Sequence, residues 1–219
     1  MGLDKLMAGN KLWAENIKKS DPRFFEKLSE LQNPEYLWIG CSDSRISPSS
    51  SLGLLPGQMF VHRNVANLVN HTDMNCLSAM QFAVEVLNVR HIIVSGHFGC
   101  GGVKAAMDDS RLGLIDNWLR HIQDIMHKYE GDLAAIADVD KRVDKLCTLN
   151  VIEQVINVGE TTIVQDAWAR GQNLAVHGWI YTIADGIYRD LNVSVRSLEE
   201  LDAFRDRTYA DRSHIAAGK

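Results

Sequence analysis

Two short segments of the sequence place cysteine, histidine, aspartate and arginine at spacings that suit metal chemistry. The first is Cys41-Ser-Asp43-Ser-Arg45, and the second is His97-Phe-Gly-Cys100. Two thiolates and one imidazole form a soft ligand set that favours Zn²⁺. Three protein ligands leave a fourth coordination position open, which is typical of catalytic zinc rather than structural zinc. Cys41, His97 and Cys100 are therefore our candidate zinc ligands.

Asp43 and Arg45, the two charged residues of the first segment, suit a role beside such a metal. Zinc in an open site lowers the pKa of bound water from about 15.7 to about 7 and so supplies hydroxide near neutrality. Asp43 is placed to accept the hydrogen of that hydroxide, while Arg45 holds Asp43 in a bidentate pair. If this pair broke, Asp43 could take the fourth zinc position and block water. The two residues thus suggest an active state and an inactive one.

Hydrophobic patterning predicts that both segments follow buried strands, because short apolar runs precede them. Strands that alternate with amphipathic helices predict an α/β fold with a mostly parallel sheet flanked by helices. Since reactive groups gather at the carboxyl ends of strands in such sheets, neighbouring strands would bring the three ligands together. The predicted strands cover 36–40, 59–62, 90–95, 174–181 and 193–195, and the longer predicted helices cover 75–87, 114–129 and 143–158.

The ends of the chain are predicted to lie outside this core. Helical spacing over 3–17 and 24–31 makes residues 1–34 an N-terminal helical arm, ahead of an α/β core at 35–200. Residues 201–219 form a polar tail that we expect to be only partly ordered from Arg205. A small-residue loop is expected at 47–57. No repeat, linker or shift in composition divides the chain, so we expect a single domain.

Composition excludes several classes of protein. The chain has 219 residues and a formal net charge of −5, with no basic block of the kind that binds nucleic acid. It contains no run of about 18 apolar residues, so we expect no membrane span, and no secretory signal. Four cysteines in such a chain favour a reducing compartment, and we therefore expect a cytoplasmic protein.

Glycines around the second segment leave one alternative to a metal. Gly101 and Gly102 precede a predicted helix, whose N-terminal N–H groups could hold a small oxyanion product. A nucleotide site is the rival interpretation, but the glycine spacing matches neither G-x-G-x-x-G nor the P-loop. The interleaved histidine and cysteine favour metal.

Three motifs in order resemble the β-class carbonic anhydrases, with a spacing close to that of bacterial members: Cys41-Ser-Asp-Ser-Arg45, Phe60-Val-His-Arg-Asn-Val-Ala-Asn67 and Gly96-His-Phe-Gly-Cys-Gly-Gly102. The resemblance runs over about 12–195. It implies reversible hydration of carbon dioxide to bicarbonate and a proton, by zinc-bound hydroxide with Asp43 and Arg45 as catalytic dyad. It also implies one Zn²⁺ per subunit, held by Cys41, His97 and Cys100.

The same resemblance implies how the subunit is built and assembled. It implies a Rossmann-like subunit whose N-terminal helical arm embraces a partner, in homodimers that often pair into tetramers. The substrate pocket would lie at the dimer interface, lined by Gln32, Phe60 and Phe82, with Gly102 beside the metal. Phe82 stands where many relatives have tyrosine, so any role of that hydroxyl is absent here.

Some bacterial members of the family hold inhibitory bicarbonate in a pocket of tryptophan, arginine and tyrosine. Trp38, Arg63 and Tyr181 occupy the matching positions. However, Ile46-Ser-Pro-Ser49 stands where Val-Pro-Ala-Glu is usual in that subgroup, and the Ser-Pro order is closer to permanently active members. A proline moved by one residue restricts a different part of the backbone. The sequence leaves the bicarbonate switch open.

Two other functions remain open at this point. The same site could act on carbon disulfide or carbonyl sulfide, as in some relatives, or the metal could serve only a dimeric scaffold. Structural zinc closed by Asp43 is a further interpretation, although Arg45 competes for that carboxylate. Cys76 and Cys147 lie in helical patterns among leucines and are predicted to be core thiols.

Overall fold

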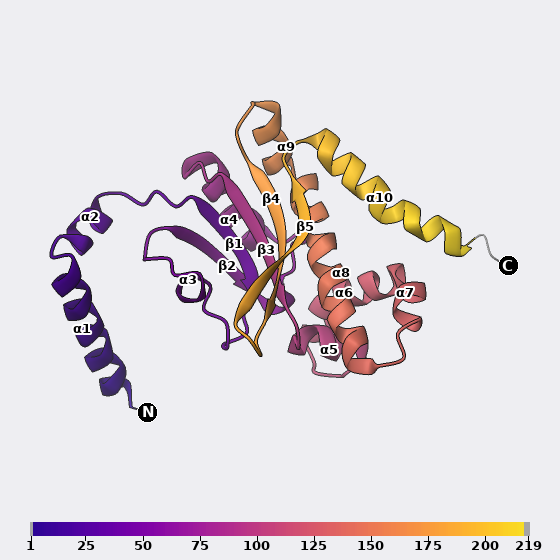
Figure 1. The fold of residues 1–219 in the computed structure, drawn as a ribbon, viewed down its shortest axis with the longest axis horizontal. Coiled ribbons are helices and arrows are strands. Elements are labelled where there is room, and N and C mark those ends of the chain that lie inside the picture. Colours follow the sequence, from indigo (N-terminus) through magenta and orange to yellow (C-terminus); the bar gives the residue numbers. More distant parts are fainter. Residues whose placement is uncertain (1, 217–219) are drawn as a thin grey trace.

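The computed structural model describes residues 2–216, with the side chains of residues 2–210. Its centre is a five-stranded sheet with the strand order β2-β1-β3-β4-β5 (Figure 1). Four strands are parallel and the last is antiparallel to its neighbour, which confirms the mostly parallel α/β prediction. The strands are β1 (Tyr36–Cys41), β2 (Met59–Asn64), β3 (His91–His97), β4 (Ala175–Thr182) and β5 (Ile187–Val195).

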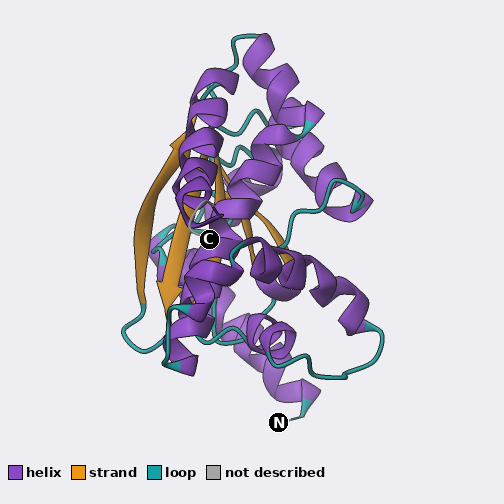
Figure 2. Ribbon diagram, turned by 90° about the vertical axis from the view of Figure 1, so that its right-hand side faces the viewer, coloured by secondary structure: helices purple, strands orange, loops and turns teal. Residues whose placement is uncertain are grey.

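Helices pack along the sheet (Figure 2). The longest, α8, contacts β3 and β4, and α5 and α6 pack beside it. Short 3₁₀ and π segments, η1 and η2, follow β2 and α4. The helical segments are α1 (Leu3–Ser20), α2 (Phe24–Glu30), α3 (Pro48–Ser51), η1 (Val65–Asn67), α4 (Met74–Gln81), η2 (Phe82–Val86), α5 (Gly101–Met107), α6 (Ile115–Lys128), α7 (Glu130–Ala134), α8 (Val139–Glu160), α9 (Thr162–Ala169) and α10 (Leu198–Ala216).

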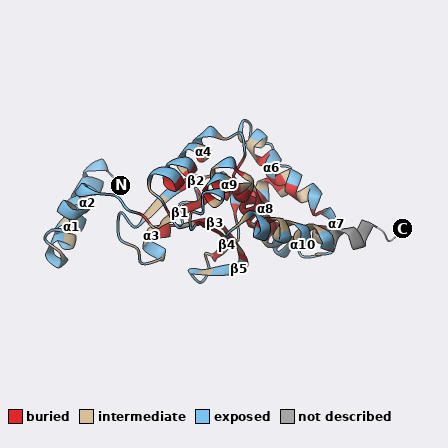
Figure 3. Cartoon of the chain, turned by 90° about the horizontal axis from the view of Figure 1, so that it is seen from above, coloured by how far each residue is buried: buried red, intermediate tan, exposed pale blue. Residues whose placement is uncertain are grey.

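One face of the sheet forms the main core. Because side chains alternate along a strand, Leu37 and Ile39 of β1 point to the same face as Ile92 and Val94 of β3, and all four are fully buried. Buried residues lie along α8, which contacts the sheet, and on the inner sides of α4 and α6 (Figure 3). Burial of this continuous apolar layer is the main force that holds the sheet against its helices.

The N-terminal helices differ from the rest of the chain in having no buried residue. Helices α1 and α2 extend away from the sheet, and α1 exposes Leu3, Leu6, Met7 and Trp13 (Figures 1 and 3). The helices predicted over 3–17 and 24–31 are confirmed, whereas the single-domain organisation stays a prediction. Among the described residues, none of the helices is both long and apolar enough to span a bilayer.

The structure differs from the sequence predictions at the C-terminal end. Residues 198–216 form the helix α10, which the sequence analysis does not predict within the polar tail at 201–219; residues 217–219 of that tail lie outside the described residues. The polar sequence of this helix carries little apolar periodicity, but Leu201 is fully buried and lies close to Gly159 of α8. Arg205 also pairs with Glu160 at 3.2 Å. Tertiary contacts with α8 therefore stabilise a helix that local patterning does not reveal.

Four smaller differences from the sequence predictions concern single elements. Strand β5 begins at Ile187 rather than at 193, because pairing with β4 extends a mostly exposed edge strand. Pro48 begins the single helical turn α3 inside the expected loop, a position that suits the fixed φ of proline. The helix predicted over 75–87 ends in the π segment η2. The sequence analysis did not identify α7 and α9, which are only 5 and 8 residues long.

Candidate metal centre

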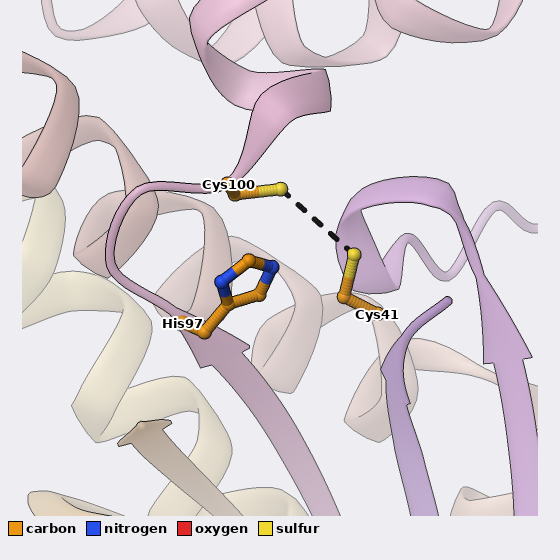
Figure 4. A group of neighbouring side chains, drawn as sticks. All are labelled: Cys41, His97 and Cys100. Carbon is orange, nitrogen blue, oxygen red and sulfur yellow. Dashed lines mark hydrogen bonds between the residues drawn. The ribbon is translucent and has the colours of Figure 1, made fainter. Parts of the chain in front are cut away.

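The three candidate ligands converge at the carboxyl ends of two adjacent strands (Figure 4). Cys41 is the last residue of β1, His97 is the last residue of β3, and Cys100 immediately precedes α5. All three are buried, and their ligand atoms lie within 4.8 Å of one another. The parallel pairing of β1 with β3 brings together residues that are more than fifty positions apart in the sequence.

The donor atoms fit a tetrahedral zinc ion. The Sγ atoms of Cys41 and Cys100 are 3.9 Å apart, and two sulfurs each about 2.3 Å from tetrahedral zinc would lie about 3.8 Å apart. His97 donates from Nδ1 to the carbonyl oxygen of Phe98 at 3.0 Å, which leaves Nε2 as the free ligand atom. This Nε2 is buried without a hydrogen-bond partner. Such an orphaned buried nitrogen is costly unless a metal binds it.

The two thiols differ in acidity because one donates a hydrogen bond to the other. The pKa of Cys41 lies well below its usual range, mainly because Cys100 donates a hydrogen bond to its sulfur. The same hydrogen bond and burial raise the pKa of Cys100. A bound metal would replace the shared proton, since both sulfurs then act as thiolate ligands.

Asp43 lies at the edge of this cluster and forms an ion pair with Arg45. Nε and one terminal nitrogen of Arg45 donate to the two carboxylate oxygens at 2.9 and 2.6 Å, and the Arg45 backbone N–H donates at 2.9 Å. These bonds hold the pKa of Asp43 far below its usual range. Oδ2 of Asp43 is 3.8 Å from Nε2 of His97. An ionised carboxylate therefore stands beside the metal position, where it can only accept hydrogen bonds.

Residues 36–188 match the family model described as carbonic anhydrase, which covers the whole sheet up to the start of β5. The chain belongs to the β-class carbonic anhydrases. It is an enzyme of reversible carbon dioxide hydration, and its cysteine–histidine–cysteine triad is typical of the zinc enzymes in this family.

Relatives and solved structures support this assignment along most of the chain. A carbonic anhydrase from Emericella nidulans is 44% identical over 190 residues, which cover 87% of this chain and 83% of that protein. The β-carbonic anhydrase of Coccomyxa has a TM-score of 0.89 with 36% identity and covers 97% of this chain and 98% of that one. One of two tetrameric β-carbonic anhydrases from Sordaria macrospora has a TM-score of 0.84 with 37% identity, covering 88% and 98%.

The similarity is greater to fungal and algal members than to bacterial ones. A carbonic anhydrase from Pseudomonas aeruginosa is 32% identical over 175 residues, which cover 75% of this chain and 76% of that protein. The motif spacing that suggested a bacterial type was therefore misleading about the subgroup. Two of the three motifs carry the candidate metal ligands, where chemistry restricts the residues, so they carry less information about lineage than the rest of the chain does.

Within a single chain, most of the predicted substrate residues lie away from the metal centre. Phe60 pairs in register with Leu37, four residues before Cys41, which places it about 13 Å from the ligand end of the sheet at about 3.3 Å per residue. Phe82 stacks on Phe60 at 6.0 Å and is 42% exposed. Gln32 precedes β1, at the end of the strand opposite to Cys41.

Gly102 does lie near the ligands, and it is tightly packed. A Cβ atom at this position would approach Cγ1 of Val65 to 2.8 Å and the Cβ of Ala66 to 3.4 Å. Close approach of α5 to the segment after β2 therefore accounts for a glycine at this position. The same packing brings that segment against the loop that carries Cys100.

The two aromatic residues of the expected bicarbonate pocket, Trp38 and Tyr181, pack against a third aromatic side chain. Tyr188 of β5 lies 5.2 Å from the Trp38 ring and 4.5 Å from the Tyr181 ring, and its hydroxyl is 3.0 Å from Oγ of Ser51. No motif in the sequence points to Tyr188. Its position depends on a register shift between β4 and β5, which leaves no local signal in the sequence.

The guanidinium of Arg63, the expected anion ligand of that pocket, is hydrogen-bonded to the backbone instead. It donates to the carbonyl oxygen of Cys41 at 2.9 and 2.7 Å and to that of Asp43 at 2.7 Å. These bonds connect β2 to the segment that carries a metal ligand and the dyad. By contrast, the prediction of core thiols at Cys76 and Cys147 is confirmed, since both are buried and outside the metal cluster.

Proposed function

We propose that carbon dioxide hydration takes place around one Zn²⁺ per subunit held by Cys41, His97 and Cys100, with Asp43 and Arg45 as the catalytic dyad. The observation that carries the proposal is the buried, unpartnered Nε2 of His97 facing two sulfurs 3.9 Å apart. Zinc bound there would act as a Lewis acid and supply a water nucleophile near neutral pH.

The protein side chains provide orientation and proton handling. The Asp43 carboxylate is ionised and can accept a hydrogen bond from the attacking water, which orients a lone pair toward carbon dioxide. Arg45 holds Asp43 away from the metal position, so the open coordination site stays available. The carbonyl of Phe98 fixes the tautomer of His97. We assign Gly102, two residues beyond Cys100, to the pocket through its backbone.

Two measurements on one purified sample test the proposal. We expect one zinc per chain by elemental analysis and rapid carbon dioxide hydration by stopped flow at pH 8.5. Zinc-loaded protein without activity would refute it. Comparison of turnover on carbon dioxide, carbon disulfide and carbonyl sulfide distinguishes hydration of carbon dioxide from hydrolysis of the sulfur compounds, and inactivity on all three would favour a zinc scaffold.

The pocket is proposed to be completed by a second copy of the chain. Gln32, Phe60 and Phe82 lie far from the ligands of their own chain, and α1 exposes a row of apolar side chains with no buried residue. Exposed apolar surface of this kind favours association. We therefore assign a homodimer in which the arm packs on its partner and the partner supplies these three residues. Pairing into tetramers is supported by the tetrameric Sordaria relatives.

The assembly is tested by changing the arm alone. In the double variant Leu6→Glu and Trp13→Glu, we expect monomers by analytical ultracentrifugation and loss of activity with zinc retained. Leu198→Glu changes a similarly exposed leucine outside the arm and should leave the oligomeric state and the activity unchanged. An active monomer would contradict a pocket shared between two copies.

The bicarbonate switch is proposed to be absent. The hydrogen bonds of Arg63 to two backbone carbonyls and the packing of Tyr188 between Trp38 and Tyr181 support this, since an anion would have to displace both.

We place the enzyme in the cytoplasm, where reducing conditions keep cysteine thiols free, and all four cysteines here are unpaired. Fractionation of the source cells tests the compartment.

A further inference from the structure

Helix α8 carries a row of amide side chains on the side that packs against the rest of the molecule. Asn150 and Gln154 are each only 1% exposed, and Asn157 is partly buried. Their spacing of four and three residues places them on one face of the helix. Amides in an apolar core are unfavourable unless their hydrogen bonds are satisfied, so a row of three requires an explanation.

All three amides bind one irregular segment, residues 65–69, which leaves the edge strand β2. Asn150 donates from Nδ2 to the carbonyl oxygen of Ala66 at 2.9 Å. The Val69 N–H donates to Oε1 of Gln154 at 2.8 Å, and Asn157 donates to the carbonyl oxygen of Val69 at 3.0 Å. The amides also bind each other at 3.0 Å, so the row acts as one connected unit.

Segment 65–69 needs external support to keep its shape. Ala66 and Asn67 have φ values of 65° and 49°, so two consecutive residues with side chains adopt the left-handed conformation. Such residues persist only where surrounding contacts determine them. Besides the amide row, the indole of Trp118 in α6 donates to the carbonyl oxygen of Val65 at 2.8 Å.

Segment 65–69 also packs against or close to each of the three segments that carry a candidate zinc ligand. The first part of the segment, η1, packs against β1, the strand that ends at Cys41. A Cβ atom on Gly96, which precedes His97, would lie 3.5 Å from Oδ1 of Asn67. Gly102, two residues after Cys100, packs against Val65 and Ala66. The segment therefore lies between the amide row and the metal centre.

We propose that Asn150 and Gln154 are positioning residues of the zinc site, which hold segment 65–69 in the conformation that packs against the three segments carrying the ligands. The inference rests on the zinc site proposed above. Groups outside the ligand set that hold metal ligands in place contribute to affinity, and their loss weakens metal binding by about 10- to 100-fold. Asn150 acts through an intervening segment, so we expect the lower end of that range.

The test compares Asn150→Ala with Thr161→Ala. Thr161 is 4% exposed and lies at the end of the same helix, but its side chain bonds only to Val158 and Val164. Zinc affinity is measured by competition with a chelator, and the ¹¹³Cd resonance of cadmium-substituted protein reports the thiolate environment. We expect Asn150→Ala to bind zinc about 10-fold more weakly and to shift the resonance. Thr161→Ala should do neither, although both variants lose thermal stability.

Asn157→Ala provides a milder variant if Asn150→Ala does not fold, because it removes only the far end of the row. It should give a smaller change of the same sign. Unchanged affinity and resonance in the folded variants would refute the inference, as would an equal loss in Thr161→Ala. Wild-type protein that binds no zinc would instead refute the proposed function, and the inference with it.

Discussion

Arg45 donates three hydrogen bonds to the Asp43 carboxylate, two from its guanidinium and one from its own backbone N–H. The Arg45 side chain is 54% exposed, whereas that of Asp43 is 15% exposed. The arginine therefore closes over the carboxylate from the solvent side. This arrangement keeps Asp43 ionised and paired with Arg45, as the active state expected from the sequence requires.

Asp43→Ala should lower the rate of carbon dioxide hydration by about 10²- to 10⁴-fold, because the attacking water loses the group that orients it and handles its proton. Zinc content should not change, since Asp43 is not a ligand in this arrangement. Stopped-flow rates with zinc analysis check both. Asp185→Ala breaks a comparable exposed pair with Arg189 and should have no effect on the rate. An Asp43→Ala enzyme with more than a tenth of the wild-type rate would contradict the dyad.

Cys100→Ser should abolish stoichiometric zinc binding and lower the melting temperature, because bound metal stabilises the folded state by mass action. Chelator should therefore destabilise the wild-type protein but leave the variant unaffected. Calorimetry with and without chelator makes the comparison.

Cys76→Ser is the matched control for that experiment. Cys76 is also fully buried, and burial raises its pKa to about 12, but it stands outside the metal cluster. The control should keep its zinc and its response to chelator. Retention of zinc by Cys100→Ser would argue against the three-ligand site.

Folding stability should increase with pH across the range just below neutrality because of His177. Burial, together with the neighbouring His91, lowers the pKa of His177 below its ordinary value of 6.5. As the pH falls below about 6.5, the unfolded chain takes up the proton first, so the stability present at higher pH is lost progressively toward the folded-state pKa. Urea unfolding between pH 5.5 and 7.5 measures this slope.

His177→Gln should reduce that slope, and His121→Gln, at an exposed position of α6, should leave it as it is. The burial of His62 lowers its pKa as well, so part of the slope should persist in the first variant. A steeper slope in His177→Gln would show that the sign of the linkage is wrong.

Bicarbonate should inhibit hydration only as a product that competes at the active site. Tyr188→Ala removes the ring between Trp38 and Tyr181, and any cooperative inhibition by bicarbonate should appear in this variant alone. Rates over a series of bicarbonate concentrations at pH 7.5 and 8.5 decide the matter. Cooperative inhibition of the wild-type enzyme would show that Arg63 can leave its carbonyl partners.

The fold class and the ligand chemistry of the site could be predicted before any coordinates were known. Apolar runs before Cys41 and His97 are long enough to identify strands, and parallel strands present their carboxyl ends on one edge. The ligand types also restrict the metal. These features depend on local pattern and on residue identity, both of which are visible without coordinates.

The distant groups that support or surround that site became visible only from the three-dimensional fold. Polar side chains such as Asn150 and Gln154 in a helix are expected to face solvent. The fold instead buries them and pairs them with the backbone of segment 65–69. Tyr188 depends on a shifted register, and the distance of Phe60 from Cys41 depends on strand pairing. Each outcome results from contacts between segments far apart in the chain, whose geometry no local pattern contains.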